Sequence, residues 1–249
     1  MQKGRDIEKN IVNSYDNKIF KELNDFQKSI IKTLFDNVTN YDRIEAGSLS
    51  EMYKPDIYLK IGNTIKYVSI KSGRSDSIHF EGIKSFILYL RNKGVSLKTQ
   101  KIILLFHYGD GTFDGSGGRR YEFNKIIEKM GDLLDEANAE LDKKELITDL
   151  MYRFVFRGFR EDEPCTDLIY FGDDNYGEYA TRENIIKYVI NKRYIHIKTL
   201  HVGPMTIQPY LRDVLRVSKH PEKREQIQVK WHYLLTDIQY VNNKLNKRK

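Results

Sequence analysis

The 249-residue sequence contains a single cysteine, Cys165, and no hydrophobic run that is long enough to cross a membrane. One cysteine excludes an internal disulfide and a zinc site made of cysteines alone. The longest apolar stretch, IILLF at 102–106, has the size of a strand, whereas a membrane span needs roughly 18 apolar residues. The first residues, MQKGRDIEKN, lack the apolar segment of a secretory signal. These absences favour a cytoplasmic protein that does not associate with membranes.

Nucleotide-binding, calcium-binding and histidine-based motifs are missing as well. The glycine-rich segment GDGTFDGSGGRR, 109–120, lacks the Lys-Ser/Thr step of a P-loop, so no nucleotide cofactor is expected. It also lacks the ligand spacing of an EF-hand. The six histidines show neither zinc-ligand spacing nor a hydrolase triad. Because the segment ends in Arg119 and Arg120, we interpret it either as a loop that touches DNA or as a plain surface turn.

Positive charge is abundant, and it is concentrated towards the C-terminus. The net charge is +7, but residues 187–249 hold 14 Lys or Arg against 4 Asp or Glu, a local charge of +10. Residues 128–183 hold 16 acidic against 7 basic residues, a local charge of −9. A basic C-terminal quarter beside an acidic middle suggests a surface for a polyanion such as nucleic acid. The alternative is a solvated, lysine-rich surface.

Hydrophobic periodicity predicts a mixed α/β core in the first half of the chain. The expected elements are a helix over 15–38, hairpin strands over 56–61 and 65–71, a helix over 79–93 and a buried strand over 101–107. Further elements follow the glycine-rich segment: helices over about 121–150 and 181–193, the latter capped by Thr181, strands over 151–157, 167–171, 194–200 and 225–231, and a closing helix. This pattern gives a core of residues 1–127 and a C-terminal extension of residues 128–249, unless the two form one continuous domain.

The hairpin KPDIYLKIGNTIKYVSIKSG, residues 54–73, brings polar side chains to one end. Strand alternation places Ser69 and Lys71 on one face and Ile70 on the other. When the hairpin folds back at its Gly-Asn turn, Asp56 returns to the same end. A carboxylate there can bind a hard divalent cation, and a lysine beside it can orient water and stabilise charge on a phosphate. The alternatives are that Asp56 only opens a strand and that Lys71 only protects a sheet edge.

The Pro-Asp step at Asp56, the hairpin and the Ser69-Ile70-Lys71 step together resemble the PD-(D/E)XK nuclease superfamily, which includes many type II restriction endonucleases and Holliday-junction resolvases. The similarity covers about residues 15–107. It implies an α/β fold with a restriction-endonuclease-like core, a central mixed β-sheet flanked by helices, and additional C-terminal elements. It also implies that Asp56 and the main-chain carbonyl of Ile70 bind Mg²⁺ and that Lys71 orients the attacking water.

Ser69 departs from the superfamily pattern, which has Asp or Glu two residues before the lysine. Some restriction enzymes of the superfamily resemble this chain in having Ser-x-Lys, and they take the missing carboxylate from the following helix. Glu81, in the first turn of the helix expected over 79–93, is therefore the predicted second metal ligand. The alternative is that it only complements the helix dipole. The remaining acidic or imidazole candidates are Asp76 and His79 as rivals, Glu45 as an additional acid, and Glu51 as a weaker choice.

Residues 201–231 form the predicted DNA-recognition region, because glutamine and arginine read base edges and basic side chains hold phosphates. The expected DNA contacts over the whole chain are Arg74, Arg119, Arg120, Gln208, Arg212, Arg216, Lys219, Gln228 and Lys230. Gln228-Val229-Lys230 is similar to an acid-x-lysine strand, but no Pro-Asp step precedes it, so we assign it a structural or DNA-contacting role.

Together the residues predict a Mg²⁺-dependent endonuclease that acts on double-stranded DNA, of the type II restriction kind. The class implies a homodimer and a 5′-phosphate product. A recombination, repair or phage-defence nuclease of the same fold is one alternative. A DNA-binding relative that has lost catalysis, with Ser69 as the mark of that loss, is the other. The long C-terminal extension favours an enzyme that reads sequence over a resolvase.

Overall fold

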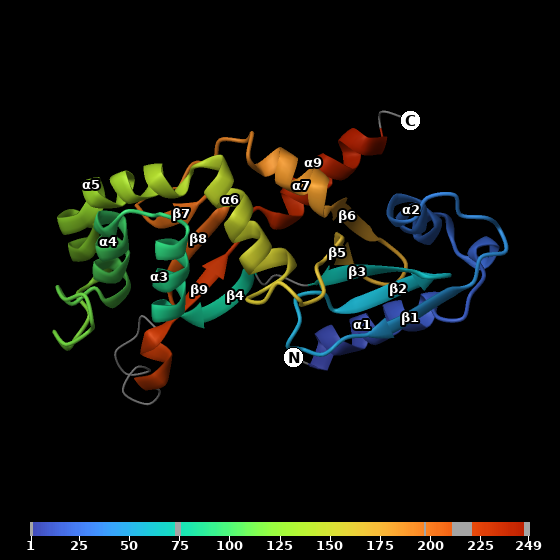
Figure 1. The fold of residues 1–249 in the computed structure, drawn as a ribbon, viewed down its shortest axis with the longest axis horizontal. Helices are drawn as coiled ribbons and strands as arrows, with labels where there is room; N and C mark the ends of the chain where they lie inside the picture. The colour runs from blue at the N-terminus through green and yellow to red at the C-terminus, as the bar shows by residue number, and fades with distance from the viewer. Residues whose placement is uncertain (1, 73–75, 197, 211–220, 247–249) are drawn as a thin grey trace. The chain divides into compact units, whose positions relative to one another are not determined.

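A computed structural model shows a mixed α/β protein that divides into two compact units (Figure 1). The structure describes residues 2–72, 76–196, 198–210 and 221–246. Unit 1 comprises residues 1–75, 151–188 and 233–249, and unit 2 comprises residues 76–150 and 189–232. The boundary expected between residues 127 and 128 lies within helix α5 (Phe123–Leu141) of unit 2, and the chain does not pass between the units there.

Unit 1 is built on a five-stranded mixed sheet in the order β1-β2-β3-β5-β6. Its strands are β1 (Ile44–Ser48), β2 (Ile57–Ile61), β3 (Thr64–Lys71), β5 (Leu168–Gly172) and β6 (Gly177–Thr181). β3 runs parallel to β5, whereas the other neighbours are antiparallel. The mixed sheet flanked by helices is the architecture that the sequence predicts.

Helices flank this sheet because its central strands bury successive side chains, such as Leu168, Ile169 and Tyr170 on β5, which point to both faces. The helical elements of unit 1 are α1 (Gln2–Tyr15), η1 (Phe20–Glu22), α2 (Asp25–Leu34), η2 (Tyr152–Phe156), α7 (Arg182–Val189) and α9 (Leu234–Asn246). α1 packs on β1 and β2, and α9 packs on β5 and β6 (Figure 1). Ile11 of α1 and Ile31 of α2 belong to the same hydrophobic core as Ile57 of β2 and Val68 of β3.

The predicted hairpin is confirmed as β2 and β3. Ile61 pairs with Thr64, so the turn contains only Gly62 and Asn63. Gly62 has a φ of 57°, a left-handed value that glycine adopts without strain, which suits a tight two-residue hairpin. The hairpin register therefore follows from the turn, and it determines which side chains meet at the open end of the hairpin.

Unit 2 contains a four-stranded antiparallel sheet in the order β4-β9-β8-β7. Its strands are β4 (Ser77–Gly82), β7 (Leu200–Val202), β8 (Met205–Pro209) and β9 (Gln226–Lys230). Its helical elements, besides α5, are α3 (Ile83–Asn92), α4 (Leu97–Tyr108), α6 (Lys144–Met151) and the short η3 (Pro221–Glu225). α3 contacts β4, α4 contacts β8 and α5 contacts β7, so helices accompany this sheet along its width.

The apolar run at 101–107 is part of helix α4, so the prediction of a buried strand is wrong. The helix begins after Ser96, whose hydroxyl accepts a hydrogen bond from the Thr99 main-chain nitrogen. It ends at Gly109, which has a left-handed φ of 61°. A short apolar run fits a buried strand and a buried helix equally well, so the capping residues identify the element better than the run does.

Other boundaries also differ from the predictions. The residues expected as a strand over 151–157 contain a π-helical turn, η2, directly after α6. Nearly every side chain there is buried, so the segment lacks the alternation of buried and exposed residues that a half-buried strand shows. The helix expected over 79–93 begins at Ile83, because the residues before it pair with β9. Among the described residues of the strand expected over 194–200, which exclude residue 197, only Leu200 is in a strand. The helix expected over 15–38 is shorter and corresponds to α2.

Several remaining predictions are confirmed. The strands at 167–171 and 225–231 correspond to β5 and β9, and the closing helix is α9. The hydroxyl of Thr181 accepts a hydrogen bond from the Asn184 main-chain nitrogen at the start of α7, as expected for its cap. Within the described part of the chain, no helix combines the length and the apolar character that crossing a membrane requires.

Candidate active site

The hairpin brings Asp56 and Lys71 together at its open end in unit 1. Asp56 directly precedes β2, and its main-chain nitrogen donates a hydrogen bond of 2.9 Å to the Val68 carbonyl on β3. Lys71 is the last residue of β3, and its Nζ lies 3.7 Å from Asp56 Oδ2. Both side chains are partly exposed, so a ligand in solvent can reach them. This convergence is what the spacing of the two residues predicts.

Ser69 orients Asp56 rather than adding a charge. Its hydroxyl donates a hydrogen bond of 3.1 Å to Asp56 Oδ2, and the main-chain nitrogen of Ile70 donates one of 2.5 Å to the same oxygen. Ser69 is only 1% exposed, so its hydroxyl has little freedom to turn elsewhere. Within the described ranges, Asp56 Oδ1 accepts no hydrogen bond. One carboxylate oxygen is therefore held by β3, and the other is available to a cation.

Glu8, on α1, is an acidic residue that interacts electrostatically with Asp56 and Lys71, and the sequence analysis missed it. Burial raises the pKa of its carboxyl, the Asp56 carboxylate raises that pKa further, and the Lys71 ammonium opposes the shift. Glu8 is therefore close enough to interact electrostatically with both catalytic candidates. The expected first helix began at residue 15, which left Glu8 outside any element. The apolar spacing of Ile7 and Ile11 is the pattern that identifies this earlier helix.

The other acidic candidates near the hairpin have different partners. Glu45, on β1, lies opposite Lys60 on β2, and its carboxylate oxygens are 3.0 and 3.1 Å from Lys60 Nζ. Glu51 forms an exposed ion pair with Arg5 of α1. Cross-strand and surface pairs of this kind are common structural contacts. Within unit 1, Glu8 is consequently a better candidate for an acid beside Asp56 than Glu45 is.

Glu81 lies on β4 of unit 2 and not in the first turn of a helix, so that part of the prediction is wrong. The strand extends to Gly82, and α3 begins only at Ile83, which removes the argument from the helix dipole. The Glu81 side chain is buried, and its Oε1 lies 3.6 Å from His79 Nε2. Asp56 belongs to unit 1 and Glu81 belongs to unit 2, so a metal site made by both residues stays a prediction.

Asp76, the other rival for the missing carboxylate, forms an ion pair with Lys230 and a close polar contact with His232 in unit 2. Its Oδ1 lies 3.1 Å from Lys230 Nζ, and its Oδ2 lies 2.5 Å from His232 Nδ1. The carboxylate thus ties the residue before β4 to the end of β9. These contacts favour a structural role for Asp76.

The donors around Asp56 fit Mg²⁺. In the parts of the chain that the structure describes, no three His, Cys, Asp or Glu side chains form a ready-made metal site. Mg²⁺, however, usually takes only one or two protein carboxylates and keeps several waters. Asp56 Oδ1 supplies an oxygen donor, and the nearby Glu8 charge adds to the negative potential that a hard cation such as Mg²⁺ requires.

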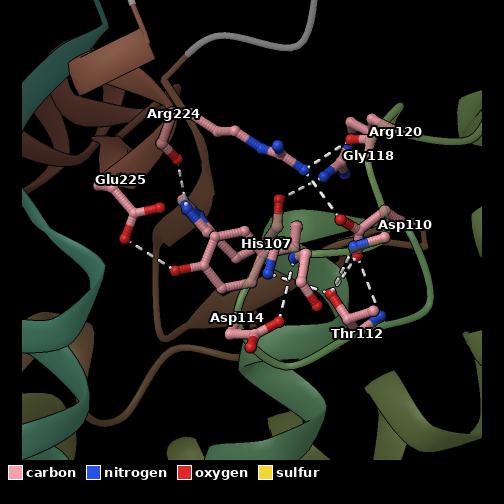
Figure 2. A network of polar contacts seen from close by, with 12 residues as sticks. His107, Asp110, Thr112, Asp114, Gly118, Arg120, Arg224 and Glu225 are labelled. Carbon is pink, nitrogen blue, oxygen red and sulfur yellow. Dashed lines mark hydrogen bonds and ion pairs between the residues drawn. The ribbon is translucent and has the colours of Figure 1, made fainter.

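The glycine-rich segment of unit 2 is held in a polar network (Figure 2). Arg120 Nη1 donates a hydrogen bond of 2.9 Å to the Phe106 carbonyl and another to the His107 carbonyl, so it caps the end of α4. Arg224 Nη2 lies 2.8 Å from Asp110 Oδ2 and 2.7 Å from the Gly118 carbonyl. These contacts give Arg120 a structural role, and a DNA contact by it stays a prediction.

The remaining DNA-contact candidates divide into three groups. Those that lie outside the described residues are Arg74, Arg212, Arg216 and Lys219. Arg119 is exposed in the glycine-rich segment. Gln208, Gln228 and Lys230 come together in the sheet of unit 2, where Gln208 pairs with Gln228 across β8 and β9. Among the candidates that the structure describes, this last group shares an arrangement.

No family model matches the chain, and no curated protein matches it. Among solved structures, the chain is similar to the restriction endonuclease MspI in complex with its cognate DNA, with a TM-score of 0.44 and 13% sequence identity. The similarity covers 91% of this chain and 88% of that chain. A likeness of this degree does not establish a family.

Proposed function

We propose that the protein is a Mg²⁺-dependent endonuclease that hydrolyses phosphodiester bonds in double-stranded DNA, of the type II restriction kind. The observation that carries the proposal is the Asp56 carboxylate, which β3 orients through Ser69 and Ile70, with the Lys71 ammonium 3.7 Å away. The resemblance of the Pro-Asp motif at Asp56 and the Ser69-Ile70-Lys71 motif to the PD-(D/E)XK superfamily also supports the proposal. Cutting both strands of a palindromic site would require a homodimer.

Each residue has a chemical role in this proposal. Asp56 Oδ1 would hold the cation, with the Ile70 carbonyl as a further ligand. Bound Mg²⁺ supplies Lewis acidity at the scissile phosphate. Lys71 would orient the attacking water and stabilise the negative charge that develops on the phosphate oxygens. The water oxygen would bond to phosphorus and release a proton to solvent, while the bond from phosphorus to the 3′-oxygen breaks and that oxygen takes up a proton. The products would be a 5′-phosphate and a 3′-hydroxyl.

The second carboxylate has two candidates. Glu81 is the one that the resemblance implies, through enzymes with Ser-x-Lys. Glu8 is favoured by its electrostatic interaction with Asp56 and Lys71. Exchanging each for glutamine distinguishes them, because the amide keeps the size of the side chain and removes its charge.

Incubation of the purified protein with unmethylated phage DNA, with and without Mg²⁺, tests the proposed activity on a gel. We expect discrete Mg²⁺-dependent bands with the wild-type protein and intact DNA with Asp56→Ala and Lys71→Ala. Lys60→Ala, which removes a lysine of the same hairpin that pairs with Glu45, is the matched control and should cut normally. A Mg²⁺-dependent smear would retain a nuclease of this fold and contradict site specificity.

A DNA-binding relative without catalysis is the second candidate function, and Ser69 in place of an acid is the observation that favours it. Such a protein would leave both linear and branched DNA intact at every Mg²⁺ concentration. It would still retard DNA in a gel, and Asp56→Ala would not change that retardation. This combination of results would contradict the endonuclease proposal.

A further inference from the structure

The sheet of unit 2 has one face that is not built as a core. Strand register places Phe80, Gln228 and Gln208 in one row across β4, β9 and β8. The positions between them on β9, Ile227 and Val229, are buried. Because paired residues of antiparallel strands project to the same side, the row lies on the face opposite these buried residues. This face, which we term the glutamine face, displays Phe80, Gln208, Tyr210, Gln226, Gln228 and Lys230.

The glutamine face contains an ordered chain of side-chain hydrogen bonds. Gln208 Nε2 donates to Gln228 Oε1 at 2.8 Å, and Gln228 Nε2 donates to Ser77 Oγ at 3.2 Å. Gln228 is thus fixed from both sides, and these two bonds use one of its amide hydrogens and one of its oxygen lone pairs. A second hydrogen and a second lone pair remain on the same planar amide. A donor and an acceptor side by side are what a glutamine needs to bind the major-groove edge of adenine.

Aromatic and cationic groups surround the glutamines. The Phe80 and Tyr210 rings meet edge to face with centroids 4.9 Å apart, and Phe80 remains 45% exposed. Lys223 Nζ lies 5.6 Å from the centroid of the Tyr210 ring. Lys230, in the next row of the sheet, is held by Asp76. Exposed rings can contact thymine methyl groups or sugars, and lysines at the margin can reach phosphates.

We propose that the glutamine face reads double-stranded DNA, and that Gln228, positioned by Gln208 and Ser77, recognises an adenine in the major groove. The inference rests on the proposed function, because it names the surface that selects the cleavage site. Charge supports DNA as the occupant, since Lys223 beside the Tyr210 ring and Lys230 on β9 both lie at this face. Fixing the amide before binding also lowers the entropy that recognition costs.

Selection from a random double-stranded DNA library, in EDTA so that cleavage cannot interfere, tests this inference. The wild-type protein should enrich a sequence that contains an adenine at a defined position. Gln228→Ala should bind that sequence about 10- to 100-fold more weakly, and it should no longer discriminate at that one position. Gln239→Ala, a glutamine of α9 in unit 1, is the matched control and should leave the preference unchanged.

Gln228→Glu gives a readout that a structural role would not produce. A carboxylate accepts hydrogen bonds but does not donate them, so the preferred base at the same position should change from adenine to cytosine, whose N4 amino group is a donor. Circular dichroism and thermal melting confirm that each variant is folded. An unchanged preference in Gln228→Ala, or an equal loss of affinity for all sequences, would overturn the inference.

The outcomes also separate this inference from the proposed function. If the wild-type protein binds a preferred sequence through Gln228 but never cuts DNA, the endonuclease proposal fails and the inference stands. If the protein cuts at a defined site and Gln228→Ala cuts at the same site with the same selectivity, the inference fails and the endonuclease proposal stands.

Discussion

At the scale of single residues, the candidate site depends on how Asp56 is oriented. Ser69 and the main chain of Ile70 hold Oδ2, and Lys71 approaches the same oxygen. A serine at this position therefore has a positive role, which is to donate a hydrogen bond, although it cannot bind a metal as strongly as the acid that the superfamily usually has. Hydrogen bonds that orient a metal-binding carboxylate contribute to its affinity for the metal.

Removing the Ser69 hydroxyl should lower the apparent affinity of the site for Mg²⁺. We expect Ser69→Ala to raise the Mg²⁺ concentration for half-maximal cleavage about tenfold, while the rate at saturating Mg²⁺ changes little, because Asp56 loses one of its orienting bonds. A Mg²⁺ titration of the cleavage rate measures this. Ser72→Ala, which removes a hydroxyl just after β3, is the control. A lower maximal rate with an unchanged Mg²⁺ requirement would contradict the orienting role.

Removing the charge of the second carboxylate should raise the Mg²⁺ requirement at least as much as Ser69→Ala does. We expect Glu8→Gln to raise the Mg²⁺ requirement by at least about tenfold, because its charge interacts with Asp56 and Lys71. Glu81→Gln, measured in the same titration, tests the other candidate. A larger effect at Glu81 would support the prediction made from the sequence and leave Glu8 with an electrostatic role only.

At the scale of elements, helix α4 ends in a network that makes unit 2 sensitive to acid. His107, near the end of α4, has a pKa that burial lowers to about 4. Its Nε2 lies 2.8 Å from the Arg224 carbonyl, a bond that opposes the shift, and the charges of Arg120 and Arg224 add to the lowering. A protonated ring would be a buried cation beside two arginines, so the folded protein keeps His107 neutral.

The free energy of unfolding should therefore fall as the pH decreases. The unfolded chain binds a proton at His107 near pH 6.5, whereas the folded protein binds it only near pH 4, so the stabilisation is complete above about pH 6.5 and is lost between these values. Between pH 7.5 and 5 the loss should be about 2 kcal/mol. Urea unfolding at several pH values measures it. In His107→Gln the free energy of unfolding should depend less on pH. If that free energy changes with pH equally in the variant and the wild-type protein, the acid sensitivity does not come from His107.

The elements also show what the sequence can predict. The hairpin of β2 and β3 was correctly predicted because its turn, its β-branched strands and its polar ends are local features. Helix α4 and the π-helical turn η2 were misread as strands because a short, continuous run of apolar residues shows no clear periodicity in the sequence. Glu8 was missed because its approach to Asp56 depends on packing between distant segments, which spacing along the chain does not reveal. Cap residues such as Ser96 and Gly109 were the available local clues.

At the scale of the whole molecule, neither unit is a continuous segment. β3, which carries Lys71, pairs on one side with β2 and on the other with β5, whose residues come about a hundred positions later. The Asp167 carboxylate, just before β5, also accepts a hydrogen bond from the Tyr67 main-chain nitrogen of β3. The sheet that supports Asp56 and Lys71 is therefore complete only when distant parts of the chain are present.

A fragment of residues 1–127, the core expected from the sequence, should consequently fail to fold. It would lack β5, β6 and α9, so β3 would become an exposed edge strand and the apolar side chains that pack on it would be uncovered. Circular dichroism and urea titration of the fragment should show no cooperative transition. A cooperative transition like that of the full chain would support the boundary at residue 127.

The division of unit 1 between distant segments has a consequence for how the protein is made in a cell. A ribosome releases the hairpin with Asp56 and Lys71 early, but α9, which belongs to the last segment of unit 1, emerges only after all of unit 2 has been synthesised. Nascent chains and prematurely terminated chains therefore carry both catalytic candidates without the packed sheet that supports them. If the proposed endonuclease activity is correct, a cell that synthesises this protein would meet that activity only after the whole chain has been made and folded.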